Sequence, residues 1–121
     1  ADHDSFTAKT EQAISFFDGV DILINNGGIS QRSFAIDTQL SVDQQIFNVN
    51  YFGTIALTKS ILPHFVSKKN GQIVVISSIM GKLGTPLRTA YAGSKHALQG
   101  FFDSLRAEVY DKNIDVTIIC P

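Results

Sequence analysis

The sequence predicts an α/β fold built on a parallel sheet with flanking helices, of the doubly wound kind. Three observations support this prediction: short apolar runs alternate with longer amphipathic stretches, residues 72–76 (QIVVI) are apolar on both faces, and no repeat or low-complexity segment interrupts the order. A strand that is apolar on both faces is typical of a parallel sheet buried between other elements. We therefore expect about three parallel strands.

The first helix and strand are expected within the first 24 residues. Residues 4–18 carry Phe6, Ile14 and Phe17 at helical spacing, and Gly19 stands where a helix terminator belongs. Residues 20–24 (VDILI) indicate a short strand. The Asn25–Gly28 cluster (NNGG) that follows is typical of a turn.

A long helix is expected over residues 41–67. Ser41 followed by Gln44 has the spacing of a capping box, and apolar residues then recur on one helical face. Pro63 is expected to bend or end the last turns, and Asn70-Gly71 to close the segment.

The remaining elements follow in the same alternation. After the strand at 72–76 comes a loop, then a second long helix over 89–111 with Thr89 as its predicted N-cap, then a strand over 114–120. In open parallel sheets, ligands bind beyond the carboxyl ends of the strands. Asn25 to Gly28, Ser78 and Pro121 are all expected at that edge.

Tyr91 and Lys95 are the strongest candidates for chemistry. They lie four residues apart on a predicted helix and therefore share one face, where the Lys95 ammonium can favour the ionised form of the Tyr91 phenol. Such a phenol can donate a proton to a carbonyl oxygen or remove one from an alcohol. Ser78, thirteen residues before Tyr91, could hydrogen-bond the same oxygen.

Composition excludes several other classes of function. Ten basic and eleven acidic residues, with no cluster beyond Lys68-Lys69, give no electrostatic footprint for nucleic acid or an anionic membrane. One cysteine, Cys120, excludes an internal disulfide and suits a reducing compartment. No apolar stretch reaches the roughly 18 residues of a membrane span. His3 and His64 lack partners at metal-ligand spacing, so no metal site is expected.

The motifs NNGGISQRS, NVNYFGT, ISSIMGK and YAGSKHALQGFF stand in the order of the short-chain dehydrogenase/reductase family. The chain resembles this family from about Asp21 to Pro121, and the sequences of its motifs are most similar to those of the group called dehydrogenase/reductase member seven. The resemblance implies a Rossmann-type domain and an NAD(P)-dependent oxidoreductase. The reaction it implies interconverts an alcohol and a carbonyl on a small lipophilic, steroid-, retinoid- or quinone-like substrate, with NADP(H) preferred over NAD(H).

The resemblance also implies residue roles. Tyr91 is then the catalytic acid/base, Lys95 lowers its pKa and binds the nicotinamide ribose, Ser78 orients the substrate oxygen, and Asn50 completes a tetrad. An amide in a helix that opens locally can hold a water that links Lys95 to solvent. Asn25, Gly27 and Gly28 correspond to the family's turn beside the adenosine half of the cofactor, with Gly27 in place of alanine, and Pro121 matches a proline beside the nicotinamide.

Partners and location are implied in the same way. The helices at 41–67 and 89–111 are expected to pair with those of a second subunit in a homo-oligomer. An intracellular protein is expected, and many relatives sit at the endoplasmic reticulum through a segment ahead of the domain, so any membrane contact is assigned to polypeptide outside residues 1–121.

The family's glycine-rich phosphate-binding turn does not occur between Ala1 and Val20, and the segment that caps the substrate pocket in the family is expected outside residues 1–121. We therefore expect residues 1–121 to be the central and catalytic part of one larger domain. Such a fragment is expected to aggregate or to bind nicotinamide poorly when isolated. A truncated binding or dimerisation module, and an isomerase or dehydratase on the same scaffold, remain alternatives.

Single residues also keep simpler interpretations. Asn50 could cap a neighbouring carbonyl, and the NNGG cluster could be only a turn. We expect a surface or packing role for His96 rather than a general base, and a core or subunit contact for Phe101-Phe102.

Overall fold

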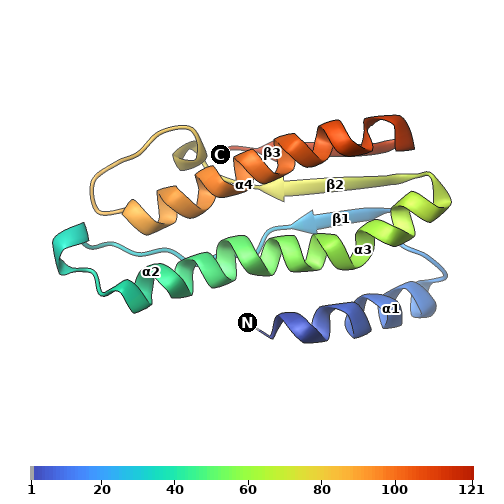
Figure 1. Ribbon diagram of the computed structural model, residues 1–121, viewed down its shortest axis with the longest axis horizontal. Helices are drawn as coiled ribbons and strands as arrows, with labels where there is room; N and C mark the ends of the chain where they lie inside the picture. Colours follow the sequence, from blue (N-terminus) through green and yellow to red (C-terminus); the bar gives the residue numbers. More distant parts are fainter. Residues whose placement is uncertain (1) are drawn as a thin grey trace.

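The computed structural model describes residues 2–121, and its three strands form one parallel sheet in the order β1-β2-β3. The strands are β1 (Ile22–Asn25), β2 (Gly71–Ile76) and β3 (Ile114–Ile119). Ile73 in β2 pairs with Leu23 on one side and Val116 on the other. All three strands therefore end at the same edge of the sheet (Figure 1). The predicted parallel sheet is confirmed, with strand boundaries shifted by one or two residues.

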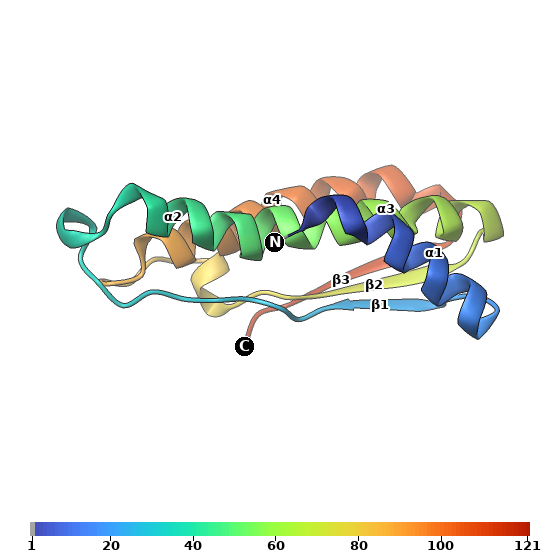
Figure 2. The same ribbon diagram turned by 90° about the horizontal axis from the view of Figure 1, so that it is seen from below.

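The helices are α1 (Phe6–Phe17), α2 (Leu40–Phe47), α3 (Thr54–Lys68) and α4 (Thr89–Val109). Figure 2 shows them on one side of the sheet, with the strands beneath. The core lies between this helical layer and the sheet and contains Ile61, Phe65, Ile73, Val75, Leu98, Phe102, Leu105, Val109, Ile114 and Val116. No helix within residues 2–121 is both long and apolar enough to cross a membrane.

The predicted helix over 41–67 is present but is not a regular α-helix throughout. A π-helix, Asn48–Gly53, joins α2 to α3. Pro63 lies inside α3, which continues to Lys68, so of the two expected effects of this proline, a bend or an end, the helix does not end there. The helix ends instead where Lys69 adopts a left-handed conformation with φ 53° and donates its N–H to Phe65 and Val66.

The two predicted N-caps are also wrong. α2 begins at Leu40, so Ser41 lies within its first turn, and the N-cap residue Gln39 makes no side-chain capping bond. Thr89 is the first residue of α4, and the N-cap residue Arg88 makes no side-chain capping bond either. An N-cap residue must precede the first helical residue for its side chain to reach the free N–H groups, and both predicted caps lie one or two positions too late.

Two main-chain bonds align the segments that leave β2 and β3. Ser77 N–H donates to the Ile119 carbonyl at 2.8 Å, and Ile79 N–H donates to the Pro121 carbonyl at 2.9 Å. These bonds hold Pro121 beside the end of β2. α4 begins at this same end of the sheet (Figure 1), which brings Tyr91 and Lys95 to the strand ends.

Candidate active site

Tyr91 and Lys95 lie in the first two turns of α4, with Lys95 Nζ 5.7 Å from the centroid of the Tyr91 ring. Lys95 is 5% exposed, and its ammonium donates to the Ile76 carbonyl at the end of β2 at 3.0 Å. Burial lowers the pKa of Lys95, because lost hydration disfavours the charged form. The predicted pair therefore forms a buried amine next to a half-buried phenol.

These two residues face a cavity of about 340 Å³ at the carboxyl edge of the sheet. Its walls are formed by Asn26, Gly28, Ile29, Ser30, Ile76, Ser77, Tyr91, Lys95 and Pro121. Four predicted site residues, Gly28, Tyr91, Lys95 and Pro121, thus meet around one space although they come from three separate segments. A Cβ at Gly28 would lie 3.3 Å from Asn50 Oδ1 and 3.8 Å from Lys95 Nζ, so glycine leaves room here.

Asn50 lies in the π-helix and is fully buried beside this cavity. Its Oδ1 accepts from Ile29 N–H at 2.8 Å, and its Nδ2 donates to the Ile29 carbonyl at 2.8 Å and to Ser94 Oγ at 3.0 Å. The helix does open locally, as expected for a π-helix. Because both amide hydrogens are used, a bound water could only donate to Oδ1 or to the main-chain carbonyl of Asn50.

Ser94 and Gln31 contribute to the site and were not predicted. Ser94 lies between Tyr91 and Lys95 in the sequence, and its side chain is fully buried. Its hydroxyl donates to the Tyr91 carbonyl at 2.8 Å and accepts from Asn50 Nδ2. A serine inside a helix often hydrogen-bonds a carbonyl of the preceding turn, so its position between the two candidate residues could have indicated a contact with Tyr91. Gln31 accepts from the main chain of Tyr91 across a separation of 60 residues, for which the sequence offers no signal.

Ser77 and Ser78 follow the end of β2, and Ser78 is the N-cap residue of a short 3₁₀ helix, Ile79–Gly81. Its Oγ accepts from Met80 N–H at 3.2 Å, so the hydroxyl proton remains available to another acceptor. Ser77, rather than Ser78, belongs to the cavity wall. Ser77 Oγ is buried without a hydrogen-bond partner in the described chain, and a Cβ at Gly81 would lie 2.7 Å from it.

Asn25 and Gly27 line a second, smaller cavity of about 230 Å³. The Asn25 side chain is buried and donates to Thr58 Oγ1 at 3.0 Å, which ties the end of β1 to α3. A Cβ at Gly27 would meet nothing within 4 Å. Asn26, which belongs to the predicted Asn25–Gly28 turn but was not singled out, lines both cavities and so links them.

His96 and the Phe101-Phe102 pair lie outside the cavity lined by Tyr91 and Lys95. His96 is exposed on α4, with Nδ1 2.8 Å from the Ala92 carbonyl, and Phe102 is fully buried in the core with Phe101 packed partly buried against it. Among residues 2–121, no group of three His, Cys, Asp or Glu side chains is placed to hold a metal ion.

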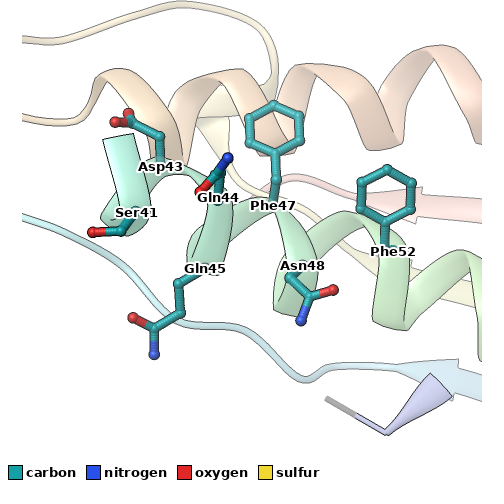
Figure 3. Close-up of a pocket in the computed structure, with 7 residues that line it drawn as sticks. All are labelled: Ser41, Asp43, Gln44, Gln45, Phe47, Asn48 and Phe52. Carbon is teal, nitrogen blue, oxygen red and sulfur yellow. The ribbon is translucent and has the colours of Figure 1, made fainter. Parts of the chain in front are cut away.

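A larger depression, about 720 Å³, lies elsewhere, along α2 and the π-helix (Figure 3). It is lined by Ser41, Asp43, Gln44, Gln45, Phe47, Asn48 and Phe52, none of which is a predicted site residue. The two phenylalanines point to the same side in Figure 3, and Phe52 is 50% exposed. Asp43 is the one ionisable side chain among these lining residues, and no Tyr, His or Lys accompanies it, so size alone does not make this surface the active site.

Comparison with known proteins gives a consistent result. A family model described as short chain dehydrogenase matches residues 1–121. Dehydrogenase/reductase SDR family member 7B from Rattus norvegicus is 51% identical over the whole chain, and dehydrogenase/reductase SDR family member 7 from Homo sapiens is 46% identical over 99% of it. The chain spans only 37% and 36% of the lengths of these two relatives.

Solved structures agree with the sequence comparison. A short-chain dehydrogenase from Streptomyces avermitilis superposes with a TM-score of 0.95 at 29% identity, over 99% of this chain and 44% of its own. ElxO with NADP bound superposes with a TM-score of 0.96 at 30% identity, over 99% of this chain and 49% of its own. The fold is therefore part of a Rossmann-type domain, and the chain belongs to the short-chain dehydrogenase/reductase family, in the group of dehydrogenase/reductase members 7 and 7B.

Proposed function

We propose that residues 1–121 are the central and catalytic part of an NAD(P)-dependent oxidoreductase that interconverts an alcohol and a carbonyl on a small lipophilic substrate. The observation that supports this most directly is the convergence of Tyr91, Lys95, Gly28 and Pro121 on one cavity at the carboxyl ends of the strands. That edge is where open parallel sheets bind their ligands. The family and the similarity to ElxO with NADP bound support the same reaction class.

A nicotinamide cofactor, when bound, would supply or receive the hydride. Tyr91 would donate its phenolic proton to the carbonyl oxygen during reduction and remove it from the alcohol during oxidation. Lys95, as a cation 5.7 Å from the ring centroid, would favour negative charge on the phenol oxygen. Ser78 has a free hydroxyl proton with which to hold the substrate oxygen.

Asn50 would complete the set by holding the π-helix and the loop after β1 in place. Its remaining Oδ1 lone pair and its main-chain carbonyl could accept from a water that resupplies protons to Lys95. A Cβ added at Gly28 would lie within 4 Å of both Asn50 Oδ1 and Lys95 Nζ, so the two side chains approach the same point of this loop, which supports this arrangement.

The described residues fit the cofactor on two grounds. Gly28 keeps the cavity open where any side chain would approach Asn50 and Lys95, and Lys95 presents an amine to the cavity wall. We propose that the cofactor extends from this cavity past Asn26 to the cavity beside Asn25 and Gly27. NADP(H) is proposed over NAD(H), supported by the similarity to ElxO structures with NADP and NADPH bound.

Two further proposals concern partners and location. The helices over 41–67 and 89–111 would form a homo-oligomer, which is supported by exposed Phe52 beside the depression in Figure 3. The same surface favours the second candidate function, a dimerisation module without activity. We propose an intracellular protein whose contact with the endoplasmic reticulum membrane, as in many relatives, would use polypeptide outside these residues.

The test is Tyr91→Phe in the complete domain, measured as NADPH-dependent reduction of a lipophilic ketone. Loss of the only group proposed to transfer the proton should lower kcat by roughly 10²- to 10⁴-fold. Tyr110→Phe is the matched control, because Tyr110 is 85% exposed beyond the end of α4 and should leave the rate unchanged. An unchanged rate in Tyr91→Phe would show that the proposed mechanism is wrong.

A further inference from the structure

The start of α4 is capped by a residue that lies far away in the sequence. In an α-helix the first N–H groups have no acceptor within the helix, and the N-cap residue Arg88 provides none through its side chain. Gln31 provides one: its Oε1 accepts from Tyr91 N–H at 3.1 Å, and its Nε2 lies 3.4 Å from Thr89 Oγ1. Gln31 is 8% exposed, so this contact is shielded from water.

The loop that carries Gln31 is fixed on both sides. At its beginning, Ile29 makes two main-chain bonds to the Asn50 side chain, both at 2.8 Å. Further along, Ser30 Oγ accepts from the Arg88 guanidinium, and Ser33 N–H donates to the Leu87 carbonyl at 3.1 Å. Residues 29–33 therefore form a bridge from the π-helix to the first turn of α4.

The segment just before α4 is itself constrained. Leu87 has φ 72°, a left-handed conformation that a branched side chain adopts only when its surroundings hold it. Its carbonyl is the acceptor for Ser33, and the Arg88 guanidinium carbon lies 5.8 Å from the Tyr91 ring centroid. The position of Tyr91 thus depends on how this segment is tied to the loop.

We propose that Gln31 is a positioning residue for Tyr91. By binding the Tyr91 main chain, it fixes the phenol relative to Gly28, which lies three positions before Gln31 in the same loop and lines the same cavity. The bond couples the turn proposed to receive the cofactor to the residue proposed to transfer the proton. This inference rests on the proposed function of Tyr91, and Gln31 itself does not line the cavity.

The experiment compares Gln31→Met and Gln31→Glu in the complete domain. Methionine keeps the buried volume but removes the acceptor, so kcat for carbonyl reduction should fall about ten- to a hundred-fold while KM for the carbonyl stays unchanged. Glutamate keeps an acceptor for Tyr91 N–H and adds a negative charge that a helix N-terminus favours, so it should restore most of kcat. Gln12→Ala, at an exposed position of α1, is the matched control.

Amide hydrogen exchange gives an independent measurement. In the unsubstituted protein the Tyr91 amide should exchange more slowly than those of Thr89 and Ala90, and Gln31→Met should remove that protection. Wild-type kcat in Gln31→Met, or an equal loss of activity in Gln31→Met and Gln31→Glu, would overturn the inference. If Gln31→Met does not fold, an unprotected Tyr91 amide in the unsubstituted protein would overturn it.

The two proposals fail in distinguishable ways. Full activity of Tyr91→Phe would end the proposed function, whatever the Gln31 variants show. An inactive Tyr91→Phe together with a fully active Gln31→Met would leave the proposed function intact and show that Gln31 only completes a helix terminus.

Discussion

Asn50 joins three segments through one side chain. Its amide bonds both main-chain groups of Ile29 in the loop after β1 and the hydroxyl of Ser94 in α4, while its own main chain belongs to the π-helix. A fully buried amide with all its hydrogens donated contributes to stability, because removing it leaves the partners unpaired away from water. The simpler interpretation of Asn50, a cap for a neighbouring carbonyl, describes only part of this arrangement.

Asn50→Ala should lower the free energy of unfolding of the complete domain by about 1–3 kcal/mol, since the Ile29 N–H and carbonyl lose their partners. Urea denaturation followed by circular dichroism measures this change. Asn48→Ala, in the same π-helix at a half-buried position, is the control and should cost less. Equal effects of the two substitutions would contradict the role assigned to the Asn50 bonds.

Helical spacing and the carboxyl ends of the predicted strands placed Tyr91, Lys95, Gly28 and Pro121 at one edge of the sheet, and these four residues line one cavity. Ser78, expected at the same edge, does not line it. The spacing of the four is informative because helical periodicity and strand ends fix positions within a few residues. Gln31 contacts a residue 60 positions away, and its loop has no periodicity that could indicate which way its side chain points. Contacts of that kind follow from the packed fold and could not be predicted from the sequence.

At the scale of elements, every predicted helix and strand is present, and the errors lie at their ends and in one irregular turn. The six residues Asn48–Gly53 form a π-helix, and Asn50 within it makes side-chain hydrogen bonds to Ile29 and Ser94. Two asparagines and a glycine in that stretch are poor helix formers, which hinted at an irregularity without giving its form. Local sequence patterns therefore predict the type of an element more reliably than its irregularities.

The contact between α3 and β2 depends on the absence of a side chain at Gly71. A Cβ there would overlap the ring of Phe65, which is fully buried and cannot move aside. Gly71→Ala should therefore lower the free energy of unfolding by about 1–3 kcal/mol, measured by urea denaturation.

Gly100 in α4 provides the opposite case. A Cβ at this position meets nothing within 4 Å. Gly100→Ala should leave stability unchanged or raise it by roughly 0.5–1 kcal/mol, because alanine is the better helix former. A neutral Gly71→Ala would show that the packing between α3 and β2 is described incorrectly, and a destabilising Gly100→Ala would show the same of the open space beside α4.

At the scale of the whole molecule, the helices cover one face of the sheet and leave the other face open (Figure 2). Ile22 and Ile24 alternate with Leu23 along β1, and they are 53% and 61% exposed whereas Leu23 packs toward the core. Ile119 of β3 is 44% exposed. An apolar sheet face of this kind is stable in water only when other polypeptide covers it, which agrees with a chain that spans 37% of its 51%-identical relative.

Residues 1–121 expressed alone should therefore self-associate, and they should bind NADPH weakly because the family's glycine-rich phosphate-binding turn does not occur between Ala1 and Val20. Light scattering after size-exclusion chromatography measures the first property, and NADPH fluorescence titration measures the second. Replacing both Ile22 and Ile24 by lysine should reduce self-association of 1–121, because it places charge on the open face. The same double substitution should destabilise the complete domain, where that face would be buried. A monodisperse monomer of residues 1–121 with tight, saturable NADPH binding would mean that the open face and the partial cofactor site have been interpreted wrongly.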